Sequence, residues 1–352
     1  MKILLFSKYS RLGASSRLRS YQFLPYLESQ GLNITLAPLF GDEYIIGLYT
    51  GKASAAVIIG AYLKRIFNIL MARNFDLFWI EKELLPLLPA WFELGLISKN
   101  IPLVVDYDDA IFHNYEHHKN LAVRTILGEK IDRIMSRADL VIAGNDYLAI
   151  RSIKAGARRV EKIPTVVDIK RYEINRPSNN SKLTIGWIGT PWTMRYLFLL
   201  EPVLRKIAST RLVNFIAIGA DKKLAGSLPI DVRPWHEETE VSEINKFDIG
   251  IMPLPDEPFE HGKCGYKLIQ YMACGLPVIA SPIGINKSLV RHGVDGFHAA
   301  DLDAWLKALL ILCDDAALRK RMGDSGRARI EEGYTLKIAE PRLLSLLRSV
   351  VS

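Results

Sequence analysis

The two halves of this 352-residue chain begin with the same succession of local features. A short apolar run from Lys2 to Phe6 is followed by a loop that contains Gly13, and then by apolar residues at helical spacing. Residues 182–188 form a second apolar run, followed by Gly189 and another helical pattern. A strand, a glycine-containing loop and a helix form the opening unit of doubly wound nucleotide-binding domains. The repetition predicts two α/β domains of this kind.

Further short apolar runs alternate with helical patterns through both halves. Each run is continuously apolar, as strands covered by helices on both faces are. Beyond the two opening strands, the predicted strands are residues 32–38, 77–80, 103–106, 140–143, 213–218, 249–252, 278–280 and 296–299. Two parallel, doubly wound sheets are therefore expected. A kink is expected at Pro25, because proline disrupts the interior of a helix.

A polar segment rich in proline, asparagine and serine separates the two halves. Its centre, residues 175–181, reads Asn-Arg-Pro-Ser-Asn-Asn-Ser, a composition typical of linkers. We expect residues 1–167 to form an N-terminal Rossmann-like domain, 168–182 a linker and 183–335 a C-terminal Rossmann-like domain. Residues 336–352 are expected to form a C-terminal helix that packs back towards the N-terminal domain.

The composition narrows the class of protein. Hydrophobic residues make up 49% of the chain and charged residues 24%, which indicates a folded protein with a large core. Three cysteines give no disulfide framework, so a reducing, cytoplasmic compartment is expected. The seven histidines form no recognisable metal-binding cluster, since His117 and His118 are adjacent and no Cys-x-x-Cys occurs, so no structural metal is expected. The most hydrophobic stretch, residues 53–63, is too short to span a membrane.

The net charge of +8 is compatible with nucleic acid, an anionic substrate, an anionic membrane, or a merely solvated basic surface. The sequence shows no aromatic-basic interleaving and no helix-turn-helix pattern, so nucleic acid is not expected as a partner. Residues 44–71 are apolar, with Lys52, Lys64, Arg65 and Arg73 in or beside them. Such an amphipathic basic surface could dock on anionic lipid at the inner membrane face. A buried helix with a solvated edge is the alternative.

The segment from Gly262 to Ser281 carries the strongest indication of a ligand. A glycine-broken loop with two lysines opens a short helix, which stops before an apolar strand. Glycines allow a ligand to approach the backbone closely, and a helix N-terminus offers unpaired N–H groups and the positive end of a dipole. Lys263 and Lys267 lie four positions apart, so they would share one face of a helix. The segment predicts a site for a diphosphate, and hence a nucleotide-linked substrate.

Several blocks together resemble the retaining GT-B glycosyltransferases of family 4, the group 1 glycosyltransferases. Lys162-Ile-Pro-Thr-Val-Val-Asp168 is similar to the interdomain signature of that family, and Tyr266–Ser281 resembles its donor-site helix and strand. Leu289–Phe297 resembles the block that follows, and Arg327–Tyr334 the ending before a terminal helix. In the first half, the resemblance rests on Gly13-Ala-Ser-Ser-Arg-Leu-Arg19 and the helix after it. It implies two Rossmann-like domains that face a central cleft.

Departures from the family pattern concern its charged positions. The family commonly has two glutamates eight positions apart, where this chain has Gly262 and Gln270. Gln270 can hydrogen-bond a ribose hydroxyl but carries no charge. The arginine and lysine that commonly follow the first strand of the second domain are replaced by Thr190 and Arg195. Arg195 keeps a cation for the diphosphate, whereas Thr190 with Pro191 fits a helix N-cap followed by proline.

The resemblance implies transfer of a sugar, with retention of configuration, from a nucleotide diphosphate-sugar to a glycan or lipid-linked acceptor. Cell-surface polysaccharide synthesis is the setting that it implies. Fixed cations would stabilise the departing diphosphate, so no metal and no cofactor are expected. The expected donor-binding residues are Gly13, Ala14, Thr190, Arg195, Trp235, Lys263, Lys267 and Gln270.

Three carboxylates at the end of the strand predicted at 103–106 are the catalytic candidates: Asp106, Asp108 and Asp109. Open α/β sheets bind ligands at the carboxyl ends of their strands, where these side chains could orient the acceptor or take its proton. Asp108 or Asp109 would also suit a helix N-cap. Further candidates in the first half are Glu81, His113, His117 and His118.

Two other functions remain open on the sequence. A nucleotide-sugar epimerase or hydrolase that uses water as acceptor would be expected to show more carboxylates around the leaving group. A non-catalytic binding or scaffold protein of the same architecture would explain the missing glutamates. Lys263, Lys267, Arg195 and the aspartates argue against the scaffold.

Overall fold

The computed structural model describes residues 1–50, 54–175, 182–226 and 228–351. The chain divides into two compact units. The first comprises Met1–Thr165, His261–Cys264 and Lys337–Ser352, and the second Val166–Glu260 and Gly265–Leu336. The predicted division therefore needs two changes, because the second unit begins at Val166 and the range 183–335 is interrupted at His261–Cys264. Part of the predicted linker, residues 176–181, lies outside the described residues.

The first unit is built on a six-stranded parallel sheet with the order β2-β1-β3-β4-β5-β6. Its strands are β1 (Lys2–Phe6), β2 (Asn33–Leu36), β3 (Leu77–Glu81), β4 (Leu103–Tyr107), β5 (Leu140–Ala143) and β6 (Val160–Lys162). Every residue of β3, β4 and β5 is buried, as expected for central strands covered on both faces. The doubly wound prediction is confirmed, and β6 is a strand that the apolar pattern did not reveal.

The second unit repeats this plan with the order β12-β11-β10-β7-β8-β9, again all parallel. Its strands are β7 (Leu183–Ile188), β8 (Val213–Ile218), β9 (Asp231–Arg233), β10 (Ile249–Met252), β11 (Val278–Ala280) and β12 (Gly296–His298). In each unit, the strand order reverses next to the opening strand, between β1 and β3 and between β7 and β10. Such reversals mark the place where ligands bind in open α/β sheets.

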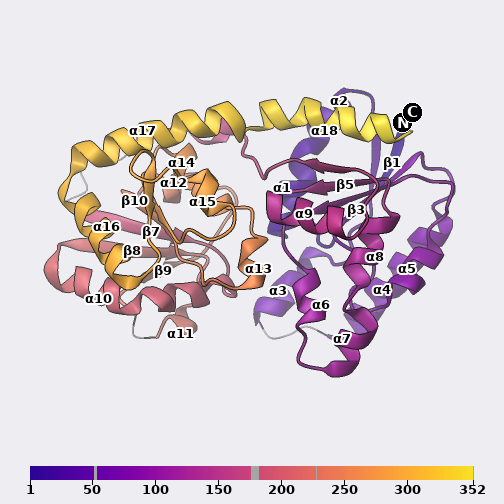
Figure 1. Cartoon of the computed structure of the whole chain (residues 1–352), viewed down its shortest axis with the longest axis horizontal. Helices are drawn as coiled ribbons and strands as arrows, with labels where there is room; N and C mark the ends of the chain where they lie inside the picture. The colour runs from indigo at the N-terminus through magenta and orange to yellow at the C-terminus, as the bar shows by residue number, and fades with distance from the viewer. Residues whose placement is uncertain (51–53, 176–181, 227, 352) are drawn as a thin grey trace. The chain divides into compact units, whose positions relative to one another are not determined.

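Helices connect the strands and lie on both sides of each sheet (Figure 1). Before residue 165 they are α1 (Ala14–Arg19), α2 (Leu24–Ser29), α3 (Asp42–Thr50), α4 (Ala55–Met71), α5 (Ala90–Leu96), α6 (Phe112–Glu116), α7 (Leu121–Leu127), α8 (Lys130–Arg137) and α9 (Asp146–Lys154). After it they are α10 (Glu201–Thr210), α11 (Lys222–Ala225), α12 (Glu240–Ile244), α13 (Pro258–His261), α14 (Tyr266–Ala273), α15 (Asn286–Leu289), α16 (Leu302–Asp314), α17 (Ala316–Gly333) and α18 (Leu336–Val351). Short 3-10 helices are η1 (Tyr21–Phe23), η2 (Ile169–Arg171) and η3 (Thr193–Leu200).

The helix expected to kink at Pro25 is two helices. The 3-10 turn η1 separates α1 from α2, and Pro25 lies in the first turn of α2. A backbone N–H in the first turn has no partner within the helix, so proline is tolerated there at no cost in hydrogen bonds. The chain therefore breaks the helix before the proline.

The C-terminal helix α18 belongs to the first unit from Lys337 onward. Leu343 and Leu347 on this helix are buried. On its exposed side, Nη2 of Arg342 lies 3.4 Å from Oε2 of Glu161, a residue of β6. Exposed ion pairs contribute little, so the apolar side chains hold the helix in place.

Among the described residues, no helix combines the length and the hydropathy that crossing a bilayer requires.

Candidate functional site

Polar side chains gather where the strand order of the first sheet reverses. Glu81, the last residue of β3, is buried, and burial raises the pKa of its carboxyl. Its Oε2 accepts a hydrogen bond from the backbone N–H of Lys8 (3.0 Å) and another from the Ser16 hydroxyl (2.5 Å). Glu81 therefore holds the loop that follows β1 against helix α1.

Gly13 and Ala14 stand at the start of α1, the helix that contains Ser16. Gly13 is the N-cap of α1, and Ala14 is its first residue. A Cβ atom at Gly13 would lie 2.4 Å from Cβ of Tyr9, so only glycine fits. The loop therefore brings backbone, and no side chain, to the position where α1 begins.

Lys82 is a central cation of this site, and the sequence analysis did not predict a role for it. Its Nζ lies 2.7 Å from Oδ1 of Asp108 and 3.4 Å from Oδ2 of Asp109, and it donates to the Ser15 hydroxyl (3.0 Å). Burial alone would lower the pKa of Lys82, but the neighbouring carboxylates raise it well above the usual value. Its φ of 65° is strained for a residue with a side chain, at a cost of about 1–3 kcal/mol. Its position directly after the strand that ends in Glu81 could have indicated a site residue, because ligands bind at the carboxyl ends of such strands.

The three candidate aspartates have different surroundings. Asp106 is buried and forms a bidentate ion pair with Arg19, with Nε–Oδ1 at 2.8 Å and Nη2–Oδ2 at 2.9 Å. Asp108 is largely buried, and the charge of Lys82 outweighs burial and lowers the pKa of its carboxyl. The side chain of Asp109 is 28% exposed, against 13% for Asp108. Asp109 is therefore the carboxylate that a ligand can reach most readily.

Helix capping does not account for these aspartates. The N-cap of α6 is Ile111, and no side chain caps this helix. Asp108 and Asp109 instead face Lys82.

The segment His261–Cys264 contacts the same aspartates within the first unit. The side-chain amide of Asn145 donates to the carbonyl oxygens of Gly262 (2.8 Å) and Lys263 (3.0 Å). The Cys264 thiol donates to the carbonyl oxygen of Asp108 (3.1 Å), and Nζ of Lys263 lies 3.7 Å from Oδ1 of Asp109. Two lysines, Lys82 and Lys263, therefore flank Asp109.

The packing explains why Gly262 stands where the family commonly has a glutamate. A Cβ atom at Gly262 would lie 2.4 Å from Cβ of Ala110 and 2.6 Å from its backbone nitrogen. No side chain fits between the segment and Ala110 without moving the backbone.

This close packing gives a stability prediction. We expect Gly262→Ala to lower the free energy of unfolding by about 1–3 kcal/mol, because overpacking forces the backbone to shift. Urea denaturation measures the change. The control is Gly95→Ala in α5, where no other part of the chain approaches the added methyl and alanine favours the helix. An equal loss in both variants would contradict the proposed crowding.

The expectation that Lys263 and Lys267 share one face of a helix is wrong. Helix α14 begins at Tyr266, and its N-cap Gly265 has a left-handed conformation with φ of 67°. This turn ends the preceding segment, so Lys263 lies outside the helix and belongs to the first unit. Lys267 lies in the first turn of α14, with Nζ 5.6 Å from the centre of the Trp187 ring.

In the second unit, the loops after β7, β8 and β9 meet at the carboxyl edge of the sheet. Thr190 follows β7, and its hydroxyl accepts from the backbone N–H of Thr193 (3.3 Å). The expected N-cap role of Thr190 is wrong, because the next helix, η3, has Trp192 as its N-cap and no side-chain cap. Gly219 follows β8 with φ of 75°. A Cβ there would lie 2.3 Å from the carbonyl oxygen of Gly189 and 3.2 Å from Cβ of Trp235. Trp235 therefore packs beside the glycine loop.

A buried hydrogen-bond network connects Gln270 with Trp235. The Gln270 amide donates to the Tyr172 hydroxyl (3.1 Å), which donates to Oε1 of Glu240 (3.4 Å). The indole N–H of Trp235 donates to Oε2 of Glu240 (2.7 Å). Glu240 and Tyr172 were not predicted, because they gain significance only from side chains distant in the sequence. The network fixes the orientation of the indole ring and of the Gln270 amide.

Arg195 lies in η3 among aromatic rings. Its guanidinium carbon is 4.8 Å from the centre of the Trp192 ring, and Nη2 donates to the Tyr196 hydroxyl (3.2 Å). The buried carboxylate of Glu260 lies 3.7 Å away and also accepts from Tyr196. The side chain of Arg195 is nevertheless half exposed, which leaves the guanidinium accessible to an anion.

One protein-family model matches a segment that lies mostly in the second unit. Residues 182–315 match the family model described as "Glycosyl transferases group 1". TuaH of Bacillus subtilis, described as a "Putative teichuronic acid biosynthesis glycosyltransferase", is 24% identical over 198 residues. The match covers 51% of this chain and 50% of TuaH. A D-inositol 3-phosphate glycosyltransferase of Mycobacterium marinum is 26% identical over 246 residues, or 60% of this chain and 49% of that protein. The chain spans about half the length of these curated relatives.

Solved structures share the fold over nearly the whole chain. HepE of Anabaena in complex with UDP superimposes with a TM-score of 0.72 and 16% identity, covering 99% of this chain and 100% of HepE. Sucrose-phosphate synthase of Thermosynechococcus elongatus gives a TM-score of 0.75 at 15% identity, covering 99% of both chains. At these identities the likeness shows the fold alone. The predicted fold class, a two-domain α/β architecture of the GT-B type, is confirmed.

Proposed function

We propose that this chain, whose fold is that of the GT-B glycosyltransferases, transfers a sugar from a nucleotide diphosphate-sugar to a glycan or lipid-linked acceptor with retention of configuration. One observation carries the proposal. Residues 182–315, which match the group 1 glycosyltransferase family model, include the accessible Arg195 and also Lys267 in the first turn of α14. Accessible cations of this kind suit a diphosphate, particularly at the positive end of a helix dipole.

The second unit is the proposed donor side. Trp235 stacks on the nucleotide base, because Glu240 holds its indole edge and orients the ring. The Gln270 amide nitrogen is bound to Tyr172, so its carbonyl oxygen is the atom assigned to a ribose hydroxyl. Arg195 and Lys267 bind the diphosphate, and Thr190 shapes the loop after β7 that approaches it.

The first unit is the proposed acceptor side. Asp109, the most exposed of the three aspartates, accepts the proton of the acceptor hydroxyl. Asp108 holds Lys82 beside it, and Asp106 fixes Arg19 in α1, so both act as positioning residues.

The proposed chemistry needs no metal. The bond between the sugar and the diphosphate breaks while the acceptor oxygen forms a new bond to the same sugar carbon, and the acceptor proton passes to Asp109. The negative charge that develops on the diphosphate is stabilised by Arg195 and Lys267. Preorganised charges of this kind are the largest expected contribution to the rate.

A thermal-shift screen of the full chain against UDP-, GDP-, ADP- and dTDP-sugars tests the proposal. A ligand at 100 times its dissociation constant stabilises a protein by about 2.7 kcal/mol. We expect one nucleotide class to raise the melting temperature in the wild type and not in Lys267→Ala. No shift with any donor would contradict the donor site. Release of free sugar would indicate a hydrolase or epimerase, and binding without turnover on any acceptor a scaffold.

A role in cell-surface polysaccharide synthesis is part of the proposal. It is supported by the name of TuaH, which refers to teichuronic acid biosynthesis. A lipid-linked acceptor, which the proposal includes, would bring the enzyme to a membrane surface.

Helix α4 carries large apolar side chains on its exposed face. Leu63 and Phe67, one turn apart, are 64% and 60% exposed. Arg65, expected from the sequence on the basic surface, instead points inward, where its Nη2 donates to the carbonyl oxygen of Ser7 (2.6 Å). Lys64 and Arg73 are exposed, whereas Lys52 lies outside the described residues. We propose that this face rests on an anionic lipid surface, as amphipathic helices do.

Replacing the apolar face tests this attachment. We expect the double variant Leu63→Glu/Phe67→Glu to bind vesicles containing anionic phospholipid at least tenfold more weakly, because burying each side chain contributes about 1.5–3 kcal/mol. Co-sedimentation measures the binding. The matched control is Ile150→Glu/Ile153→Glu on α9, since both isoleucines are exposed in the same unit. Vesicle binding that is equal in the two double variants would contradict the assignment of this face.

A further inference from the structure

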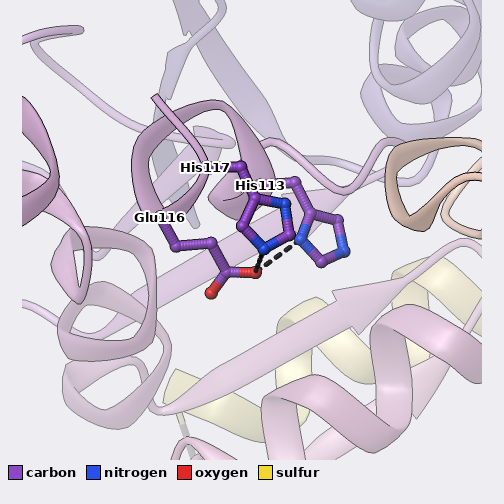
Figure 2. Close-up of side chains that lie close together, drawn as sticks. All are labelled: His113, Glu116 and His117. Carbon is purple, nitrogen blue, oxygen red and sulfur yellow. Dashed lines mark ion pairs between the residues drawn. The ribbon is translucent and has the colours of Figure 1, made fainter. Parts of the chain in front are cut away.

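Three potential metal ligands gather at helix α6 of the first unit, as Figure 2 shows. The ligand atoms of His113, Glu116 and His117 all lie within 4.8 Å of one another. Oε1 of Glu116 is 2.5 Å from Nδ1 of His113 and 3.8 Å from Nε2 of His117. The two histidines are four positions apart, so a single helical turn brings their rings to the same side, where they stack with centres 5.0 Å apart.

Neighbouring side chains orient His113 and Glu116 through hydrogen bonds. In metal sites, the residues around the ligands orient them in the same way. The Tyr147 hydroxyl lies 2.8 Å from Nε2 of His113, so this nitrogen can carry the hydrogen while Nδ1 keeps its lone pair. Arg151 donates to Oε2 of Glu116 (2.8 Å), which leaves Oε1 towards the histidines. The charge of Arg151 is itself matched by a bidentate contact with Asp132.

A simple ion pair explains the cluster less well than a metal. The side chain of His113 is buried, so its ring is held in a fixed position beside Glu116. Among the described residues, no hydrogen bond of acceptable geometry reaches its Nδ1, although this atom faces Oε1 of Glu116. Nδ1 of His113 and Oε1 of Glu116 are therefore placed side by side where one ion could bind both.

We propose that His113, Glu116 and His117 bind one Zn²⁺ ion, through Nδ1, Oε1 and Nε2 respectively. Zinc takes imidazole nitrogen and carboxylate oxygen at about 2.0–2.2 Å in four-coordinate geometry, so a water or another exchangeable ligand would complete the site. Two nitrogen ligands disfavour magnesium and calcium, which prefer oxygen. His113 and Glu116 lie in the five-residue helix α6, which is too short to be stable alone, and His117 is its C-cap. The ion would therefore tie the first turn of α6 to its C-terminal end. The inference uses none of the proposed donor or acceptor residues.

Zinc titration of the full chain tests the site. Protein freed of metal with EDTA is titrated with ZnCl2 by calorimetry, and bound zinc is counted by elemental analysis. We expect one ion per chain in the wild type, and at least a tenfold loss of affinity in His117→Ala. His117 is 58% exposed, so this substitution leaves the core intact, as circular dichroism can check.

The adjacent histidine provides the matched control. His118 lies outside the cluster, and His118→Ala should bind zinc as the wild type does. Glu116→Gln should also weaken binding, because it removes the anionic ligand. No zinc bound by the wild type, or equal affinity in His117→Ala and His118→Ala, would overturn the proposal.

Discussion

Lys267→Ala should lower kcat for sugar transfer by about 100–1000-fold, because losing one preorganised charge at a developing anion typically costs about 3–4 kcal/mol of activation free energy. Lys267 stands in the first turn of α14, where its charge adds to the positive end of the helix dipole. The side chain is only partly buried, so the fold should be unaffected. Initial rates with the donor identified by the thermal-shift screen measure the effect.

The control for Lys267 is Lys222→Ala, which removes an exposed lysine from α11 in the same unit. This variant should keep the wild-type rate. A rate of Lys267→Ala within threefold of the control would remove Lys267 from the diphosphate site. A melting temperature of Lys267→Ala below that of the wild type, measured in the absence of donor, would instead indicate a structural role.

Asp106→Asn should lower the free energy of unfolding by about 3–5 kcal/mol, the usual effect of removing one partner of a buried ion pair. Arg19 would keep its charge in a buried position but lose both charged oxygens that it now contacts at 2.8 and 2.9 Å. Urea denaturation of the variant and the wild type measures the difference.

Two further variants separate this effect from a general sensitivity to charge. The double variant Asp106→Leu/Arg19→Met should recover much of the lost stability, since replacing a whole buried pair by apolar residues is often neutral. Lys320→Ala breaks an exposed pair with Asp324 and should change the stability by about 0–1 kcal/mol. If Asp106→Asn folded normally but lost transfer activity, Asp106 would have to contact the acceptor itself.

Much of the secondary structure was predictable because it depends on local patterns. The runs at 2–6, 103–106 and 213–218 are apolar at every or nearly every position, and each forms a buried or largely buried strand. The three-residue strand β6 escaped detection because its sequence, Val-Glu-Lys, is not apolar and it pairs with β5 alone. An edge strand needs no apolar run, since only part of it is covered.

The candidate site was only partly predictable, because charged residues acquire a role from their partners. Asp108 and Asp109 were recognisable at the end of a strand, but the cation between them, Lys82, was not. Glu240 was equally hidden, since nothing near it in the sequence indicates that it holds the indole of Trp235 and contacts Tyr172.

The sequence by itself determined the two doubly wound sheets, because a strand, a glycine loop and a helix are each encoded within a few neighbouring residues. Only the tertiary structure decided which residues meet. It places Lys263 beside Asp109, and it leaves no room for a side chain at Gly262 because Ala110 fills that space. It also turns Arg65 into the core while Phe67 faces outward. Such outcomes depend on packing between segments far apart in the chain, which no local pattern records.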